Sequence, residues 1–298
     1  MPLEQTQPDL PEIKALDPPP EVSSSASPPV EDPSASRFMD GVPGWAAQGG
    51  IMLLSVLIGL GIWHMGSTQG WNIYLNFRNI PTPGEVFEAT LGNVADPEFY
   101  VHIRVSIWRV MSSFVLAVLV GVPTGLLMAR NRIARAALIP YIEIMRPIPA
   151  VAWIPLAILM WPTEEASIIF ITFLGAFFPI VLNTINGAEQ TPEVLLRATR
   201  SLGASRFAEF RHVVFPAALP SISAGLAVGM GVAWFSLLAG EIISGQYGIG
   251  YFTWDAYSMV RTPDIVLGML VIGGLGTAST YGIRLLTRPM LKWQKRTR

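Results

Sequence analysis

Six apolar stretches, each long enough to cross a bilayer, constrain this chain more than any other feature. They run roughly over 47–66, 103–129, 136–160, 166–186, 213–240 and 264–286. About 20 apolar residues span the hydrocarbon core, and backbone groups in lipid must be hydrogen-bonded within their own segment. The composition agrees, with 51% hydrophobic and 14% charged residues. The sequence therefore predicts an all-α fold: a polytopic membrane helical bundle of six transmembrane helices, in one domain over 45–298.

Residues 1–44 differ from the rest, because proline, serine and acidic residues alternate there and apolar residues are sparse. Such a segment cannot bury enough surface to offset the entropy of ordering it, so we expect a disordered tail. It lacks the positive region and adjacent apolar run of a secretory signal, and we expect it to be retained. A partner-binding role for the tail is the alternative.

Arginine and lysine gather in three connections: after the second stretch, after the fourth and after the sixth. The opposite loops hold only Arg78 and Arg261. Basic residues favour the cytoplasmic side of a membrane. We therefore expect a multi-pass protein with both termini in the cytoplasm, together with the basic loop around 190–212.

That loop carries the signals of two short helices. Thr191 is expected to cap the first helix, Pro192 suits its first position, and Gly203 is expected to end it with a positive φ. Ser205 is expected to cap the second helix, which should run up to Pro216. The sequence predicts a two-helix projection at 190–212, which is either a docking element or a plain amphipathic surface hairpin.

Several chemistries find no support in the sequence. There is no cysteine, and the three histidines are scattered, so we expect neither a metal site nor catalytic residues. No nucleophile and base are clustered as an intramembrane enzyme would need. An ion-driven secondary transporter usually needs inverted repeats and acidic residues in the middle of a span, and the sequence shows neither. No phosphate-binding loop of the form G-x-x-x-x-G-K-[ST] is present, so the sequence offers no such site for ATP hydrolysis.

The 190–212 loop resembles the cytoplasmic coupling loop of ABC importer permeases. Their pattern is Glu-Ala-Ala, three residues, Gly, nine residues and Ile-x-Leu-Pro. In this sequence Gly203 aligns with the glycine of the pattern. The Glu-Ala-Ala positions are occupied by Arg197-Ala198-Thr199. The resemblance implies that this loop contacts the ATPase, through Glu193, Arg197, Ala198, Thr199, Gly203, Ala204, Phe207, Arg211 and Pro216.

The third stretch contains four prolines in the string RPIPAVAWIPLAIL and its lead-in, and prolines break helices unless neighbours satisfy the freed carbonyls. This string and the later GAFFPIVLNTING resemble the permease subgroup that imports nitrate, bicarbonate, cyanate, taurine and alkanesulfonates. The GIGYFTWDAY segment looks closest to nitrate and bicarbonate members. The resemblance thus ranks nitrate (or nitrite) first, with bicarbonate or cyanate and then taurine or alkanesulfonate as alternatives.

The same resemblance implies a type I ABC importer permease fold in the inner membrane of a bacterium. It implies a homodimer surrounded by lipid, cytoplasmic ATPases that hold ATP and magnesium, and an external solute-binding protein. No nucleic acid partner and no cofactor of the chain's own are expected.

Charged and aromatic residues near the spans are candidates for the pathway. Arg104 and Arg109 enter the second stretch from outside and could attract anions, or Arg104 could reach lipid headgroups. Arg146 could assist an anion or simply pair with Glu143, three residues earlier. The segment that follows the fifth stretch resembles the family's external gating loop or is an ordinary turn with interfacial aromatic residues; its candidates are Glu241, Tyr251, Trp254 and Asp255. Gly121, Gly125, Gly225 and Gly229 offer small helix faces, expected to support the bundle and a homodimer.

Overall fold

The structure is a computed structural model that describes residues 44–71, 76–244 and 246–291, and its regular elements are helices. The chain divides into two compact units, Met1–Ile58 and Gly59–Arg298, so that the boundary falls inside the first helix, α1 (Gly44–Gln69). The predicted tail at 1–44 lies outside the described residues, apart from Gly44. The remaining elements belong to the second unit.

The predicted spans are confirmed as long helices. Five helical runs are long and apolar enough to cross a membrane: Gln48–Gln69, Pro97–Arg130, Glu164–Glu189, Arg206–Ile243 and Thr262–Leu291. They contain α1, α3 (Pro97–Arg130), α6 (Glu164–Glu189), α9 (Phe215–Ser244) and α11 (Thr262–Thr287) with its extension η4 (Arg288–Leu291). Most reach several residues beyond the predicted bounds, because polar residues such as the capping Asp96 and Thr163 start the helices outside the apolar stretch.

The third predicted span is a bent pair instead of one straight helix. Helix α4 (Arg132–Met145) and the run formed by η2 (Ala150–Trp153) and α5 (Ile154–Met160) meet at 91°. Pro147 and Pro149 lie in the break, where missing N–H groups prevent the helix from continuing. The one span predicted over 136–160 is therefore interrupted where two of its four prolines lie.

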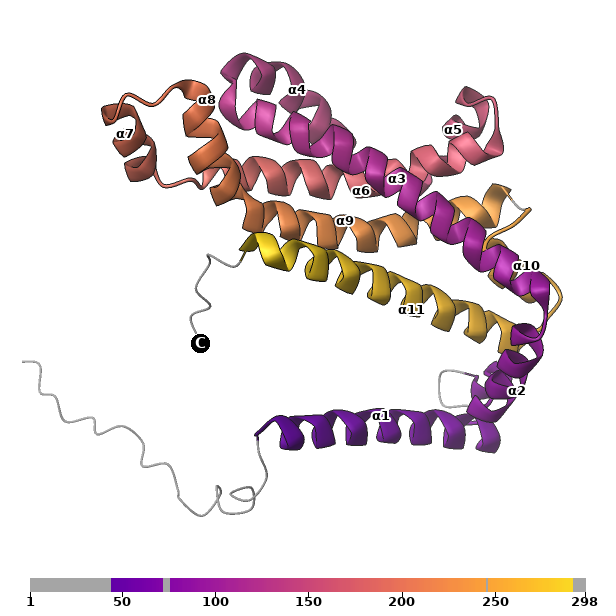
Figure 1. Ribbon diagram of the computed structural model, residues 1–298. Coiled ribbons are helices and arrows are strands. Elements are labelled where there is room, and N and C mark those ends of the chain that lie inside the picture. The colour runs from indigo at the N-terminus through magenta and orange to yellow at the C-terminus, as the bar shows by residue number, and fades with distance from the viewer. Residues whose placement is uncertain (1–43, 72–75, 245, 292–298) are drawn as a thin grey trace, which may run out of the picture. The chain divides into compact units, whose positions relative to one another are not determined.

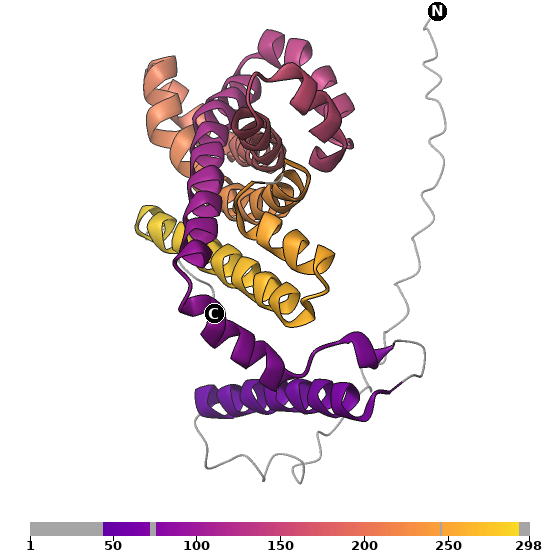
Figure 2. The ribbon, with the colours of Figure 1, turned by 90° about the vertical axis from the view of Figure 1, so that its right-hand side faces the viewer.

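The core of the second unit forms where α6 packs between α3 and α9, and α11 packs against α9 (Figure 1). Ala176 and Ile180 of α6 meet Phe114 of α3 and Trp234 of α9 in one buried cluster. The bent pair α4 and α5 lies on the side of α3 and α6 away from α11, as Figure 2 also shows. Two short helices, α7 (Glu193–Ser201) and α8 (Arg206–Glu209), lie at one end of this bundle, and α10 (Ile249–Ser258) lies at the other.

Glycines allow these helices to approach closely. A Cβ on Gly125 of α3 would lie 2.7 Å from Thr184 Cβ of α6, and one on Gly225 of α9 would lie 2.6 Å from Asn183 Cβ. Gly121 and Gly229 face Ile180 in the same way. The small-residue faces therefore support packing within the chain, as predicted; their expected use between two copies stays a prediction.

The stretch before α3 contains a short helix, α2 (Pro83–Val94). Thr82 accepts from the Glu85 N–H while the Glu85 carboxylate accepts from the Thr82 N–H, so this helix begins with a capping box. Asn93 Nδ2 donates to Asp264 at 2.8 Å and thereby fixes α2 to the first turn of α11.

Candidate functional site

The projection at 190–212 is a helix–turn–helix whose turn depends on Gly203. This glycine has φ +74°, and its N–H donates to the Arg200 carbonyl at 3.0 Å. The next N–H, of Ala204, donates to the Thr199 carbonyl at 3.1 Å. These two bonds form a Schellman motif, which requires a left-handed residue at the glycine position. The predicted positive φ is confirmed.

The ends of the two short helices agree with the predictions only in part. Ser205 Oγ accepts from the Ala208 N–H at 3.2 Å and caps α8, as predicted. The capping role predicted for Thr191 is wrong: its hydroxyl donates to the Ala188 carbonyl at 2.9 Å, and α7 begins after Pro192 with no side-chain cap. The Thr191 hydroxyl thus closes the end of α6, and the N-cap position of α7 is occupied by Pro192.

The second short helix does not end at Pro216, contrary to the prediction. It continues through a π-helical turn, η3 (Phe210–Val214), into α9, and Pro216 lies in the first turn of α9. The Phe215 N–H donates to the Phe210 carbonyl, five residues back. This widened turn accommodates a proline that lacks its own N–H. The chain therefore runs from α8 into α9 as one continuous helical segment.

A buried carboxylate joins the projection to the bundle. Glu209 is 3% exposed and accepts from Arg200 Nε of α7 at 3.0 Å and from Arg130 at the end of α3. The hydrogen bond to Glu209 raises the pKa of Arg200 above its ordinary value. We call Glu209, Arg200 and Arg130 the clamp. Sequence reasoning missed Glu209, although it is the single acidic residue between Glu193 and Glu241, among several arginines.

The outer face of the projection carries apolar side chains that are exposed in the part of the chain that the structure describes. Leu202 is 85% exposed, and Val194, Leu195 and Phe207 are also exposed. The predicted contact residues Glu193, Arg197, Ala198 and Arg211 are exposed as well; Glu193 and Arg197 form a loose pair at 3.9 Å. Exposed apolar side chains ringed by charges are typical of a docking surface.

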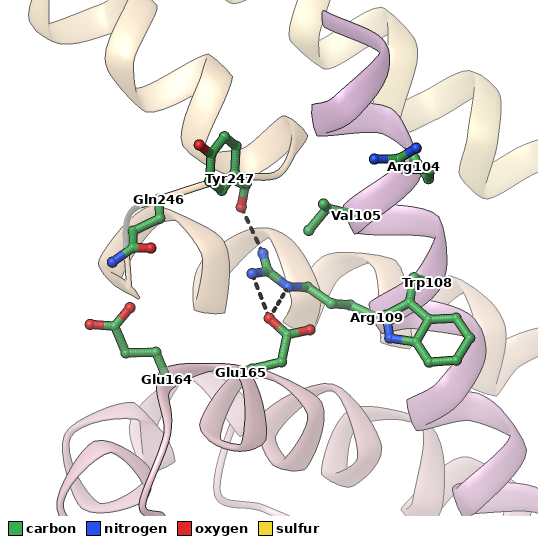
Figure 3. Close-up of a pocket in the computed structure, with 8 residues that line it drawn as sticks. All are labelled: Arg104, Val105, Trp108, Arg109, Glu164, Glu165, Gln246 and Tyr247. Carbon is green, nitrogen blue, oxygen red and sulfur yellow. Dashed lines mark hydrogen bonds and ion pairs between the residues drawn. The ribbon is translucent and has the colours of Figure 1, made fainter. Parts of the chain in front are cut away.

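At the opposite end of the bundle, Arg109 is engaged by two carboxylates, those of Glu241 and of Glu165, and Figure 3 draws the contact with Glu165. Its Nη2 lies 2.7 Å from Glu165 Oε2, its Nη1 lies 3.2 Å from Glu241 Oε1, and Nη1 also donates to the Tyr247 carbonyl at 2.6 Å. A guanidinium held in this way is not a free charge for an anion. The arrangement supports a positioning role for Arg109 better than the predicted pathway role.

The cluster fixes the start of α10. The N–H groups of Gly248, Ile249 and Gly250 donate to His102 Nδ1, Ser106 Oγ and Glu241 Oε2 at 3.1, 2.8 and 2.9 Å. The free N–H groups of a helix N-terminus are thus satisfied by α3 and α9. A Cβ on Gly248 (φ +123°) would collide with the Glu241 carboxylate, which explains why glycine is needed here.

The segment that resembles a gating loop is therefore largely the helix α10, contrary to the loop that we predicted. Glu241 is 1% exposed, Tyr251 lies beside His102, and Asp255 pairs with Arg261 at 2.7 Å. Trp254 is about half exposed and packs against Tyr257. The gating role of these residues stays a prediction.

A hollow of about 680 Å³ adjoins the cluster, and Figure 3 shows Arg104 at its edge. Its described lining contains two arginines, Arg104 and Arg109, and two glutamates, Glu164 and Glu165. The positive and negative side chains on this lining are therefore equal in number. The cationic vestibule that we predicted gains no support from this hollow. Arg146, the third pathway candidate, pairs with Glu143 at 3.7 Å, as its spacing predicted.

Comparison with known sequences identifies the type of chain. Residues 121–287 match the family described as binding-protein-dependent transport system inner membrane component. The chain is 35% identical over 207 residues to the nitrate import permease protein of Synechocystis sp. (66% of this chain, 75% of that protein). It is 33% identical over 220 residues to the taurine transport system permease protein of Escherichia coli (72% and 80%). It is 36% identical over 188 residues to the bicarbonate transport system permease protein of Synechococcus elongatus (63% and 68%).

A solved structure shares the fold. The inward-facing MetNI methionine ABC transporter contains a chain that superposes with a TM-score of 0.50, at 20% sequence identity, over 63% of this chain and 98% of that chain. At this identity the similarity concerns the fold alone.

Proposed function

The chain belongs to the family of inner membrane components of binding-protein-dependent transport systems, and we propose that two copies form the pathway of an ATP-driven importer of small anions, with nitrate as the first candidate. The permease class and the nitrate, taurine and bicarbonate subgroup follow from the relatives. In this family the ATPase is a separate subunit. The choice of nitrate rests on the GIGYFTWDAY and RPIPAVAWIPL resemblances.

The observation that supports the proposal best is the projection formed by α7 and α8. It presents exposed Leu202 and Phe207 to a partner, and it is connected to the bundle at three places. Glu209 joins it to α3, the helical run through η3 joins it to α9, and Thr191 adjoins the end of α6. An ATPase that closes on ATP and magnesium would push this projection and thereby tilt these three helices together.

Opening toward the outside would involve the other end of the same helices. The Arg109 cluster joins α3, α6 and α9 to the start of α10, so a tilt of the three helices changes the distances within this cluster. An external solute-binding protein would release its anion at this end and would perform most of the selection. Substrate choice is therefore expected to depend on that protein more than on the cluster.

The proposal is tested with the complete complex in proteoliposomes, with ATP inside and the binding protein outside. Labelled nitrate, bicarbonate and taurine uptake are measured in parallel, together with ATP hydrolysis. We expect ATP-dependent nitrate uptake that fails when the projection carries Leu202→Asp. Met259→Asp, which changes an exposed apolar residue directly after α10 (62% exposed, against 85% for Leu202), serves as the control. Robust taurine uptake without nitrate uptake would refute the ranking, and uptake without ATP would refute the class.

Orientation is tested with the same complex. The chain has no cysteine, so a single introduced cysteine reports its own side of the membrane. We propose that the projection is cytoplasmic, in line with the positive-inside rule. Leu202→Cys should react with a membrane-impermeant maleimide only from the cytoplasmic side and Ser258→Cys only from outside. The reverse pattern would contradict the proposed orientation.

A further inference from the structure

The Arg109 cluster has a buried part, in which Glu241 is the central acceptor. Glu241 is 1% exposed, its two carboxylate oxygens lie 2.8 and 2.9 Å from Ser106 Oγ, and the Gly250 N–H donates to it at 2.9 Å. Ser106 is fully buried as well. Buried groups that separate find no water to replace the lost bonds, so breaking them is costly. We therefore expect α3, α9 and the start of α10 to stay together at this end of the bundle.

The contact of the cluster with α6 is exposed. Arg109 Nε and Nη2 donate to the same oxygen of Glu165, at 2.9 and 2.7 Å. The Glu165 side chain is 44% exposed, whereas that of Arg109 is 8% exposed. Water can replace the guanidinium around such a carboxylate, and ion pairs that water reaches contribute little net stability. The bond between α3 and α6 is therefore the part of the cluster that separates at least cost.

The hollow beside the cluster can receive the carboxylate after separation. It has about 680 Å³, and Glu165 lines it together with Arg109 and Arg104 (Figure 3). Arg104 is an exposed residue of α3, five positions before Arg109. A carboxylate that leaves Arg109 thus remains in a wet hollow that a second guanidinium also lines.

We propose that the Arg109–Glu165 pair is a latch that holds the outside end of the bundle closed until the loaded binding protein docks. The latch separates between the two side chains, while Arg109 stays with Glu241 and the Tyr247 carbonyl. Glu165 is then a positioning residue, which acts through Arg109 and touches no substrate.

The latch rests on the proposed import function, in which closure of the ATPases and opening of the outside end occur together. A contact that opposes opening therefore also opposes closure of the ATPases. Without the binding protein, the latch keeps ATP hydrolysis slow. Docking of the binding protein supplies the free energy that separates the pair.

The test measures ATP hydrolysis by the complete complex in proteoliposomes, with and without the binding protein. Glu165→Gln keeps the size of the side chain and one acceptor oxygen but removes the charge. Hydrolysis without the binding protein should rise roughly fivefold, and stimulation by the binding protein should fall by about the same factor. Damage to the fold would lower both rates, so a fall in both would count against the latch.

Glu164→Gln is the matched control. Glu164 also lies in the first turn of α6 and lines the same hollow, so its replacement loses the same favourable interaction with the helix dipole. The control should hydrolyse ATP without the binding protein at the rate of the unchanged complex. Equal rates in Glu164→Gln and Glu165→Gln would overturn the latch.

Ionic strength provides a second measurement, on the unchanged chain. Raising sodium chloride from about 0.1 M to about 1 M shortens the Debye length from about 10 Å to about 3 Å and weakens an ion pair that water reaches. Hydrolysis without the binding protein, divided by that of Glu165→Gln at the same salt, should rise with salt in the unchanged complex and in Glu164→Gln. The division removes effects of salt elsewhere in the complex, and a ratio independent of salt would contradict the latch.

The latch and the import function fail in different ways. If the unchanged complex takes up the anion with ATP and Glu165→Gln hydrolyses ATP at the unchanged rate without the binding protein, the latch is refuted and the import function stands. If the unchanged complex shows no ATP-driven uptake, the import function is refuted and the latch with it.

Discussion

Replacement of Gly203 tests whether the turn of the projection carries the coupling. The residue has φ +74°, and nothing lies within 4 Å of an added Cβ, so a side chain there meets no steric obstacle. The whole cost is conformational. A β-branched residue in the left-handed region costs about 1–2 kcal/mol, whereas asparagine visits that region more readily. Gly203→Val should therefore destabilise the Schellman turn, and Gly203→Asn should have little effect.

The consequence is expected in coupling and not in membrane insertion. A change of 1–2 kcal/mol alters a local equilibrium by a factor of about 5–30, enough to weaken the hold of the ATPase on the projection. The assay measures the ratio of ATPase to permease after purification in detergent and the hydrolysis stimulated by the binding protein. Gly203→Val should lower both, with normal amounts of permease in the membrane.

Gly92→Val on α2 is the matched control, because a Cβ there also meets nothing within 4 Å and the backbone is helical. It should leave both readouts unchanged. If Gly203→Val retained normal complex yield and stimulated hydrolysis, or if Gly203→Asn failed as severely as valine, the strain argument would be refuted.

Three further predictions concern the clamp, the packing and the tail. Glu209→Gln removes the carboxylate shared by two arginines and should reduce stimulated hydrolysis and uptake, whereas Glu88→Gln on exposed α2 should not; equal activities would contradict the clamp. Gly125→Val would place a side chain against Thr184 Cβ (2.7 Å) and Val181 O (2.9 Å), which should cost about 1–3 kcal/mol and lower the unfolding temperature. Gly273→Val, which meets nothing within 4 Å, is its control, and an unchanged unfolding temperature in Gly125→Val would refute the close approach. Deletion of residues 2–40 should leave insertion and transport intact, because that segment has no apolar stretch that needs burial; loss of folding would contradict the prediction.

Composition and local backbone chemistry were sufficient to predict the long apolar helices of this protein, although not α10 or the π-helical turn η3. Apolar length determines which segments are spanning helices, because lipid leaves the backbone no other partner. The positive φ of Gly203 and the capping of α8 by Ser205 follow from interactions within a few residues, and sequence reasoning predicted both. The prolines of the third span likewise indicated a break, although not its angle of 91°.

Only the tertiary structure decided which polar groups meet. Glu209 reaches Arg130 across 79 residues, and Glu241 reaches Ser106 across 135 residues, distances at which no sequence spacing predicts contact. For the same reason Arg109 was expected to be a free cation and is instead held between two carboxylates.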